Sequence, residues 1–212
     1  MISKTKNREY SEKEKAILES TVKILSQGTN PYSVKVSEIA ELAGVGKGTV
    51  YEYFKSKEEV LYNSIVFCIH TEMNSVKRKL IEAETFVDRL EIAMSSVSEN
   101  LKNKFSAFNL MSNGNWFKEF FPKNIHHEDN CFTELKAVEE IIDLIVEAGE
   151  REKYMLKTDS VFYKRMVIKN ALFSYGHYLL FERNFDIMIK NGDIKSDIYK
   201  MVVRSLKESE DR

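Results

Sequence analysis

The residues best suited to chemistry in this 212-residue chain form a polar run between two stretches of helical hydrophobic spacing. Lysine, threonine and tyrosine side chains can hydrogen-bond to base edges or phosphate oxygens, and glycine lets a helix start approach a duplex closely. Such a surface suits a helix that lies in the major groove of DNA. We predict DNA contacts for Gly46, Lys47, Gly48, Thr49, Tyr51 and Tyr53.

The hydrophobic spacing around this run predicts two short helices joined by a sharp turn. Ile39 lies on the buried face of the first helix, and its neighbour Ala40 is small enough for a second helix to approach. Gly44 stands where the first helix must stop, because glycine readily adopts left-handed backbone angles. Val50 and Phe54 recur at helical spacing and pack the second helix against the first. This pattern is typical of a helix-turn-helix.

The overall charge of the chain does not by itself indicate a nucleic-acid partner. The formal net charge is -1, and the excess of lysine and arginine over acidic residues in the first sixty positions is slight. The local placement of Lys35, Lys47, Lys55 and Lys57 around the two predicted helices is more informative, because clustered cations bind phosphates. The cations of residues 4–8 form either a groove-contacting arm or a solvated tail.

The run over residues 39–61 resembles the N-terminal signature of the TetR family of bacterial transcriptional regulators. The rest of the chain is similar to that family only in its length and helical character. The positions that match the signature in register are Ile39, Ala40, Ala43, Gly44, Val45, Gly48, Thr49, Tyr51, Phe54, Lys57 and Leu61.

The resemblance implies a DNA-binding domain over residues 1–55 and a helical ligand-binding and dimerisation domain over residues 56–212. It also makes Lys57 a predicted DNA contact. The chain departs from the family at Lys35, where members often carry a serine or threonine that caps the helix and touches a phosphate. Ser33 or Ser37 is the alternative cap, and we predict DNA contacts for Lys35 and Ser37.

The same glycines invite comparison with the phosphate loops of nucleotide-binding enzymes. A Walker loop here would need glycine at position 41 and serine or threonine at position 48, but Glu41 and Gly48 stand there. A dinucleotide fingerprint starting at Gly44 would need glycine or alanine at position 49, where Thr49 stands. Both spacings therefore disfavour a nucleotide site.

With only two prolines and eight glycines, the chain is predicted to be all-α, with an N-terminal three-helix helix-turn-helix domain and a larger C-terminal helical bundle. Ser11 with Glu14 and Ser56 with Glu59 are capping boxes that open two helices. The second runs to about Leu80 and links the two domains. Loop or short turns are predicted for 112–129, and further helices for 86–101, 105–111, 132–148, 159–181 and 198–206.

The C-terminal part carries an uncharged segment over residues 170–181, and a helix that is apolar on every side is buried on every side. A second copy of the chain can cover one of those sides, so we predict a homodimer through the last two helices, as in the TetR family. The alternative is the core of a monomer. The residues of the last helix assigned to this interface are Ile198, Met201, Val202, Val203 and Leu206.

Aromatic and methionine side chains in the C-terminal part can line a pocket for the small apolar effector that the resemblance implies. Ordinary core packing is the alternative for each of them. The predicted ligand-binding residues are Phe105, Phe108, Met111, Trp116, Phe120, Phe173 and His177.

Other chemistry has weaker sequence support. His126, His127, Glu128, Asp129 and Cys131 are a dense group of metal-capable residues, but adjacent residues rarely point at one ion. We predict no metal and no cofactor there, the alternative being a solvated loop in which Asp129 caps the next helix. Cys68 and Cys131 are expected to be reduced thiols, with redox sensing as the alternative.

These observations predict a function. We expect a cytoplasmic, ligand-responsive transcriptional regulator without enzymatic activity, because no export signal, membrane span or catalytic constellation can be identified. It would be a homodimeric repressor of a palindromic operator in double-stranded DNA, released by an unidentified small apolar effector. The alternatives are a helical enzyme or a non-DNA interaction protein with its site in the aromatic C-terminal part.

Overall fold

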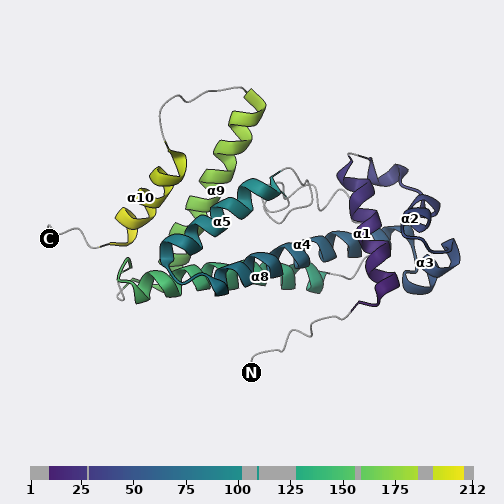
Figure 1. Ribbon diagram of the computed structural model, residues 1–212, viewed down its shortest axis with the longest axis horizontal. Coiled ribbons are helices and arrows are strands. Elements are labelled where there is room, and N and C mark those ends of the chain that lie inside the picture. The colour runs from purple at the N-terminus through teal and green to yellow at the C-terminus, as the bar shows by residue number, and fades with distance from the viewer. Residues whose placement is uncertain are drawn as a thin grey trace. The chain divides into compact units, whose positions relative to one another are not determined.

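The computed structural model describes residues 10–27, 29–101, 109, 128–155, 159–185 and 193–207, with backbone alone for 128–135 and 182–185. The regular secondary structure of these residues is entirely helical, which confirms the predicted all-α fold (Figure 1). In chain order the elements are α1 (Glu12–Ser26), the short 3-10 helix η1 (Pro31–Ser33), α2 (Val36–Leu42), α3 (Lys47–Tyr53), α4 (Lys57–Glu82), α5 (Phe86–Asn100), α8 (Glu128–Arg151), α9 (Val161–Phe185) and α10 (Ile194–Leu206).

The described chain forms two compact units. The first unit contains α1, η1, α2, α3 and α4 up to Thr71, together with the start of α8 up to Glu134. The second unit contains the rest of α4 from Glu72, α5, α8 from Leu135, α9 and α10.

The first unit is built on an apolar stripe of α1. The Ser11 hydroxyl accepts a hydrogen bond from the Glu14 amide at 3.2 Å, as the predicted capping box requires, and so fixes the start of the helix. Ile17 and Leu18 are fully buried, and α1 packs against both α2 and α3. The ring of Tyr10 meets that of Phe67 edge-on, with centroids 5.3 Å apart. The two short helices are therefore held on an apolar support.

The second unit packs α5 against α9 and α10, which lie side by side in Figure 1. The buried guanidinium of Arg89 in α5 ties two other segments to it, donating from Nε to the Ala83 carbonyl at 3.1 Å and from Nη1 to the Leu144 carbonyl at 2.5 Å. Because Ala83 follows the last residue of α4, the cation also lies at the negative end of that helix dipole. Arg89 thus joins the end of α4 to α5 and α8.

Two expectations about helix boundaries are corrected, and one lies outside the described residues. α8 begins at Glu128 and not near residue 132, so the predicted loop cannot extend to 129 and Asp129 lies inside the helix instead of capping it. α10 begins at Ile194, four residues before the predicted start, because Asp193 caps it by accepting from the Ser196 amide. Of the helix predicted for 105–111, only residue 109 is described.

Candidate nucleic-acid interface

The turn between α2 and α3 has the geometry that its sequence predicts. Gly44 adopts φ +66°, the left-handed conformation that an L side chain rarely takes. The Val45 amide then donates to the Ala40 carbonyl at 3.0 Å, which closes the end of α2. Val50 and Phe54 are buried beneath α3, so its other face points outward.

The residues predicted to read DNA are accessible to solvent at α3. Lys47, Gly48, Tyr51 and Tyr53 of α3 are exposed, as is Gly46 immediately before it, while Thr49 is half-buried. The structure therefore leaves five of these six residues exposed, and only Val50 of α3 is buried.

The start of α2 corrects the expected helix cap. Lys35 occupies the N-cap position, and a lysine ammonium has no lone pair with which to accept a backbone hydrogen bond. The Glu38 carboxylate accepts instead from the Lys35 amide at 3.2 Å. Ser33 is not the cap, because it belongs to η1 and precedes the N-cap position by two residues, and its hydroxyl donates to the Asn30 carbonyl at 2.8 Å. Ser37 lies inside α2, where its side chain is exposed.

The start of α4 is closed by its own side chains and contacts a distant turn. The Ser56 hydroxyl accepts from the Glu59 amide at 3.1 Å, and the Glu59 carboxylate accepts from the Lys55 amide at 2.6 Å. Lys57 Nζ donates to the carbonyl oxygen of Tyr32, in η1, at 2.8 Å. Sequence reasoning missed this last contact, and the only local signal was the turn-forming Asn30-Pro31 pair before Tyr32.

The lysines near the two short helices form no ion pair within the part of the chain that the structure describes. None of the ion pairs formed by the described side chains involves Lys35, Lys47, Lys55 or Lys57. The first three of these side chains are exposed to solvent. Their charges are therefore available to an anionic partner such as a phosphate backbone.

The predicted effector site is described only in small part. Phe105, Phe108, Met111, Trp116 and Phe120 lie outside the described residues, as do the side chains of the metal-capable group at 126–131. Phe173 and His177 do come together, with ring centroids 6.5 Å apart. His177 is exposed and Phe173 half-buried.

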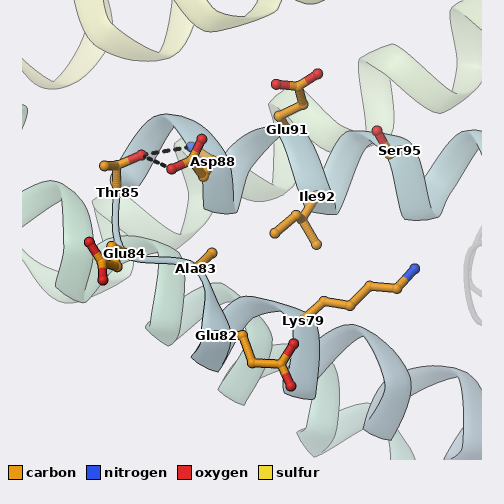
Figure 2. A pocket seen from close by; sticks show the side chains of 9 residues that line it. All are labelled: Lys79, Glu82, Ala83, Glu84, Thr85, Asp88, Glu91, Ile92 and Ser95. Carbon is orange, nitrogen blue, oxygen red and sulfur yellow. Dashed lines mark hydrogen bonds between the residues drawn. The ribbon is translucent and has the colours of Figure 1, made fainter.

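A cavity of about 670 Å³ lies elsewhere, at the corner between α4 and α5 (Figure 2). Four acidic residues are among those that line it, together with Lys79 and Ile92: Glu82, Glu84, Asp88 and Glu91. None of the lining residues is one that the sequence predicts to bind the effector. Among the residues described, no three metal-ligating side chains gather at one point, and no helix is long and apolar enough to cross a membrane.

The helices predicted to form a dimer interface differ in part from expectation. Ile198, Val202 and Leu206 are buried within the single chain, because this face of α10 packs on its own neighbours, so they are corrected to core residues. Met201 is exposed instead. In α9 the single chain covers the uncharged segment only in part, since Phe181 is 55% exposed, and the predicted second copy would have to cover the rest.

Comparison with known proteins places the first unit in a class. The geometry of α2, Gly44 and α3 is that of a DNA-binding helix-turn-helix, and residues 17–62 match the family described as "Bacterial regulatory proteins, tetR family". This match confirms the resemblance drawn from residues 39–61: the N-terminal segment is a helix-turn-helix of the TetR family. No curated protein sequence matches the chain.

Solved structures share the fold over almost the whole chain. FadR from Bacillus subtilis, solved in complex with stearoyl-CoA, is 19% identical, with 91% of this chain and 97% of that chain covered and a TM-score of 0.59. FadR from Bacillus halodurans, a fatty acid degradation regulator, is 17% identical, with 97% and 100% covered and a TM-score of 0.62.

A third similar structure shows that this fold is not confined to proteins described as regulators. The superantigen PfiT is 15% identical to this chain, with 95% and 100% of the two chains covered and a TM-score of 0.63. Identities at this level establish a common fold, whereas function depends on the site that each protein builds on it.

Proposed function

We propose that this protein is a ligand-responsive, DNA-binding transcriptional regulator, acting as a homodimeric repressor that a small apolar effector releases from a palindromic operator. The observation that carries the proposal is the helix-turn-helix of residues 17–62, in which a left-handed Gly44 turns α3 outward. A fold-level likeness alone would not support a function. The exposed polar groups of α3 support one, together with neighbouring lysines that form no ion pair with the described carboxylates.

The proposed DNA site divides into base-reading and phosphate-binding residues. Lys47, Thr49 and Tyr51 of α3 present donors and acceptors suited to base edges in the major groove. The remaining contacts proposed are to the DNA backbone, where charge and close approach matter more than base identity. These backbone contacts are proposed for Lys35, Ser37, Gly46, Gly48 and Tyr53, in a DNA-binding domain of residues 1–55. Lys57, two residues beyond that domain, belongs to the same surface.

The proposed dimer interface rests on apolar side chains that a single chain leaves exposed. Phe162 and Met166 of α9 are 74% and 41% exposed, and Phe181 of the same helix and Met201 of α10 are exposed as well. Large apolar side chains grouped on the last two helices are best covered by a second copy with two-fold symmetry. Two reading helices would then enter successive major grooves about one helical turn apart.

The proposed effector is a small apolar molecule bound by the domain of residues 56–212. Long-chain acyl-CoA is the first class to test, because FadR from Bacillus subtilis was solved with stearoyl-CoA. Its acyl chain is apolar, although its CoA head is large and charged, so the free fatty acid should be tested beside it. An effector that prefers the non-binding conformation by about 1 to 3 kcal/mol would lower operator affinity by about 5- to 150-fold. The predicted lining residues remain those of the aromatic group containing Trp116, Phe173 and His177.

Selection of bound sequences from a random DNA pool tests the proposal directly. The full chain should enrich a palindrome whose half-sites lie about one turn or a small multiple of a turn apart, and Tyr51→Ala should change the recovered bases. Lys23→Ala, an exposed lysine of α1 outside the proposed contact set, is the matched control and should recover the parent sequence. Recovery of no enriched sequence by the parent would overturn the DNA-binding function.

Sedimentation tests the dimer separately. Phe181→Glu should convert the dimer to monomers, because it places a charge in the proposed interface. Ile81→Glu changes a side chain of α4 that is equally exposed, at 59%, and should leave the dimer intact. A parent that sediments as a monomer would contradict the proposed interface.

A further inference from the structure

Lys57 differs from the other lysines of the candidate interface, because its ammonium already has a partner in the protein. Its Nζ donates to the Tyr32 carbonyl oxygen at 2.8 Å, across a sequence separation of 25 residues. The side chain is half-buried, whereas those of Lys35, Lys47 and Lys55 are exposed. One of the three ammonium hydrogens of Lys57 is therefore taken up by a main-chain acceptor of the protein itself.

The turn that Lys57 holds is ordered by its own hydrogen bonds. The Asn30 side chain accepts from the Tyr32 amide at 2.9 Å, and the Asn30 carbonyl accepts from the Ser33 amide at 2.9 Å. The Lys57 bond adds a long-range tie to this local network. Because α4 starts four residues after α3 ends, the tie brings η1 within one lysine side chain of the segment that follows the reading helix.

The held turn leads directly to Lys35. Val34 and Val36, on either side of it, are 2% and 6% exposed, so the main chain of Lys35 is anchored from both directions. The alternation of extended backbone leaves the Lys35 side chain pointing outward. Its amide is bound by the Glu38 carboxylate, but its ammonium makes no ion pair with the carboxylates that the structure describes.

We propose that Lys57 is a positioning residue: it holds the η1 turn so that Lys35 binds a DNA backbone phosphate, and it makes no phosphate contact itself. This inference rests on the proposed function. In this proposal Lys35 binds DNA, and Lys57 holds Lys35 in position. It also explains how an N-cap position occupied by lysine serves the interface, although lysine cannot cap the helix.

The salt dependence of DNA binding distinguishes positioning from direct contact. Each phosphate that a cation neutralises adds about 0.9 to the magnitude of the slope of log K against log salt concentration. Affinities of the full-length parent, Lys35→Met, Lys57→Met and the double variant should be measured by fluorescence anisotropy over a range of salt. The probes are the consensus duplex recovered by selection and a 30-base-pair duplex of arbitrary sequence.

The expected pattern is non-additive. Lys35→Met should reduce the slope by about 0.9 per bound chain, and Lys57→Met should reduce it by the same amount or less. The double variant should match Lys35→Met alone, because Lys57 acts only through Lys35. Lys23→Met, which removes an exposed charge of α1 away from η1, should leave the slope unchanged.

Hydrogen exchange supplies a readout that is independent of DNA. Lys57→Met should speed exchange of the Ser33 amide, which the η1 turn protects, and Lys35→Met should not. Equal exchange in parent and Lys57→Met would overturn the positioning role.

The outcomes separate this inference from the proposed function. A reduction of about 1.8 in the double variant would show that each lysine binds its own phosphate, and an unchanged slope in Lys35→Met would show that Lys35 binds none. Either result overturns the division of roles while the parent still binds DNA. A parent that binds neither duplex overturns the proposed function and this inference together.

Discussion

Charged side chains are used differently in the two units. In the first unit, Lys35, Lys47 and Lys55 face solvent, and the described residues give them no carboxylate partner. In the second unit, cations of α9 are paired with carboxylates of α8. Arg165 binds Asp143 with both Nε and Nη2, at 2.7 and 2.6 Å, and Lys169 pairs with Glu139.

The charged side chains of the two units also differ in how deeply they are buried. Lys164 of α9 is 1% exposed and donates to Glu150 of α8 at 2.6 Å. The hydrogen bond from Arg165 to Asp143 raises the pKa of that guanidinium further above its ordinary value, with a smaller opposing effect from loss of water contact. Paired charges of this kind fix how α8 lies along α9, whereas unpaired lysines keep counterions that a DNA phosphate can displace.

The largest loss of stability is expected from a substitution in the apolar core of the first unit. Phe54→Ala removes a side chain that is 1% exposed beneath α3, and should lower the free energy of unfolding by about 3 to 5 kcal/mol. Tyr51→Ala, on the exposed face of the same helix, should change it by about 0.5 kcal/mol or less. Urea denaturation followed by circular dichroism measures both, and equal losses would contradict the assigned orientation of α3.

In the second unit, stability should depend on the carboxylate of the buried Lys164–Glu150 pair. Glu150→Ala leaves the Lys164 ammonium buried without its carboxylate, and should cost about 3 kcal/mol in thermal or urea unfolding. Glu140→Ala breaks an exposed pair, in which the side chains of Lys77 and Glu140 are 40% and 55% exposed. It should lower the free energy of unfolding by only about 0 to 1 kcal/mol. Similar losses for both variants would mean that burial does not distinguish the two pairs.

A substitution at Gly44, in the turn between α2 and α3, should lower stability through backbone conformation alone. A Cβ added at Gly44 meets no atom within 4 Å, but the residue has φ +66°, so Gly44→Ala should lose about 1 to 2 kcal/mol. Gly48 of α3 has equally open surroundings and no positive φ. Gly48→Ala should therefore stabilise the protein by up to about 1 kcal/mol, and destabilisation of similar size in both would refute the conformational explanation.

The smallest expected effect lies at the aromatic cluster of the second unit. Burial, followed by a hydrogen bond with Tyr154, raises the pKa of Tyr199 to about 12 from 10.0. Because the folded protein retains this proton longer than the unfolded chain, the associated stability is complete below pH 10 and is lost as pH rises toward about 12.

Phenolate absorbance during an alkaline titration measures this shift. Tyr199→Phe should remove one late-titrating tyrosine from the alkaline phase, whereas Tyr51→Phe, at an exposed position of α3, should retain it. An unchanged late phase in Tyr199→Phe would show that the shift belongs to another residue.

Local patterns in the sequence predicted much of the framework. Helix starts at Ser11 and Ser56 follow from side chains that bond to amides three residues away, and the turn at Gly44 follows from the backbone freedom of glycine. The buried stripes of α1 and α4 follow from helical periodicity, which is also a short-range property. These features were predictable because their causes lie within a few residues.

What the tertiary structure decided depends on partners that are far apart in the chain. Periodicity treats a lysine as a surface residue, and only the packing of α8 against α9 shows that Lys164 is buried and paired. The same is true of Val202, which faces its own chain and not a second copy. Lys57 is a third case, because its acceptor, the Tyr32 carbonyl, is a main-chain atom that no side-chain pattern reveals. Local sequence thus determined the starts of α1 and α4 and the Gly44 turn, while long-range packing determined which charges are buried or paired.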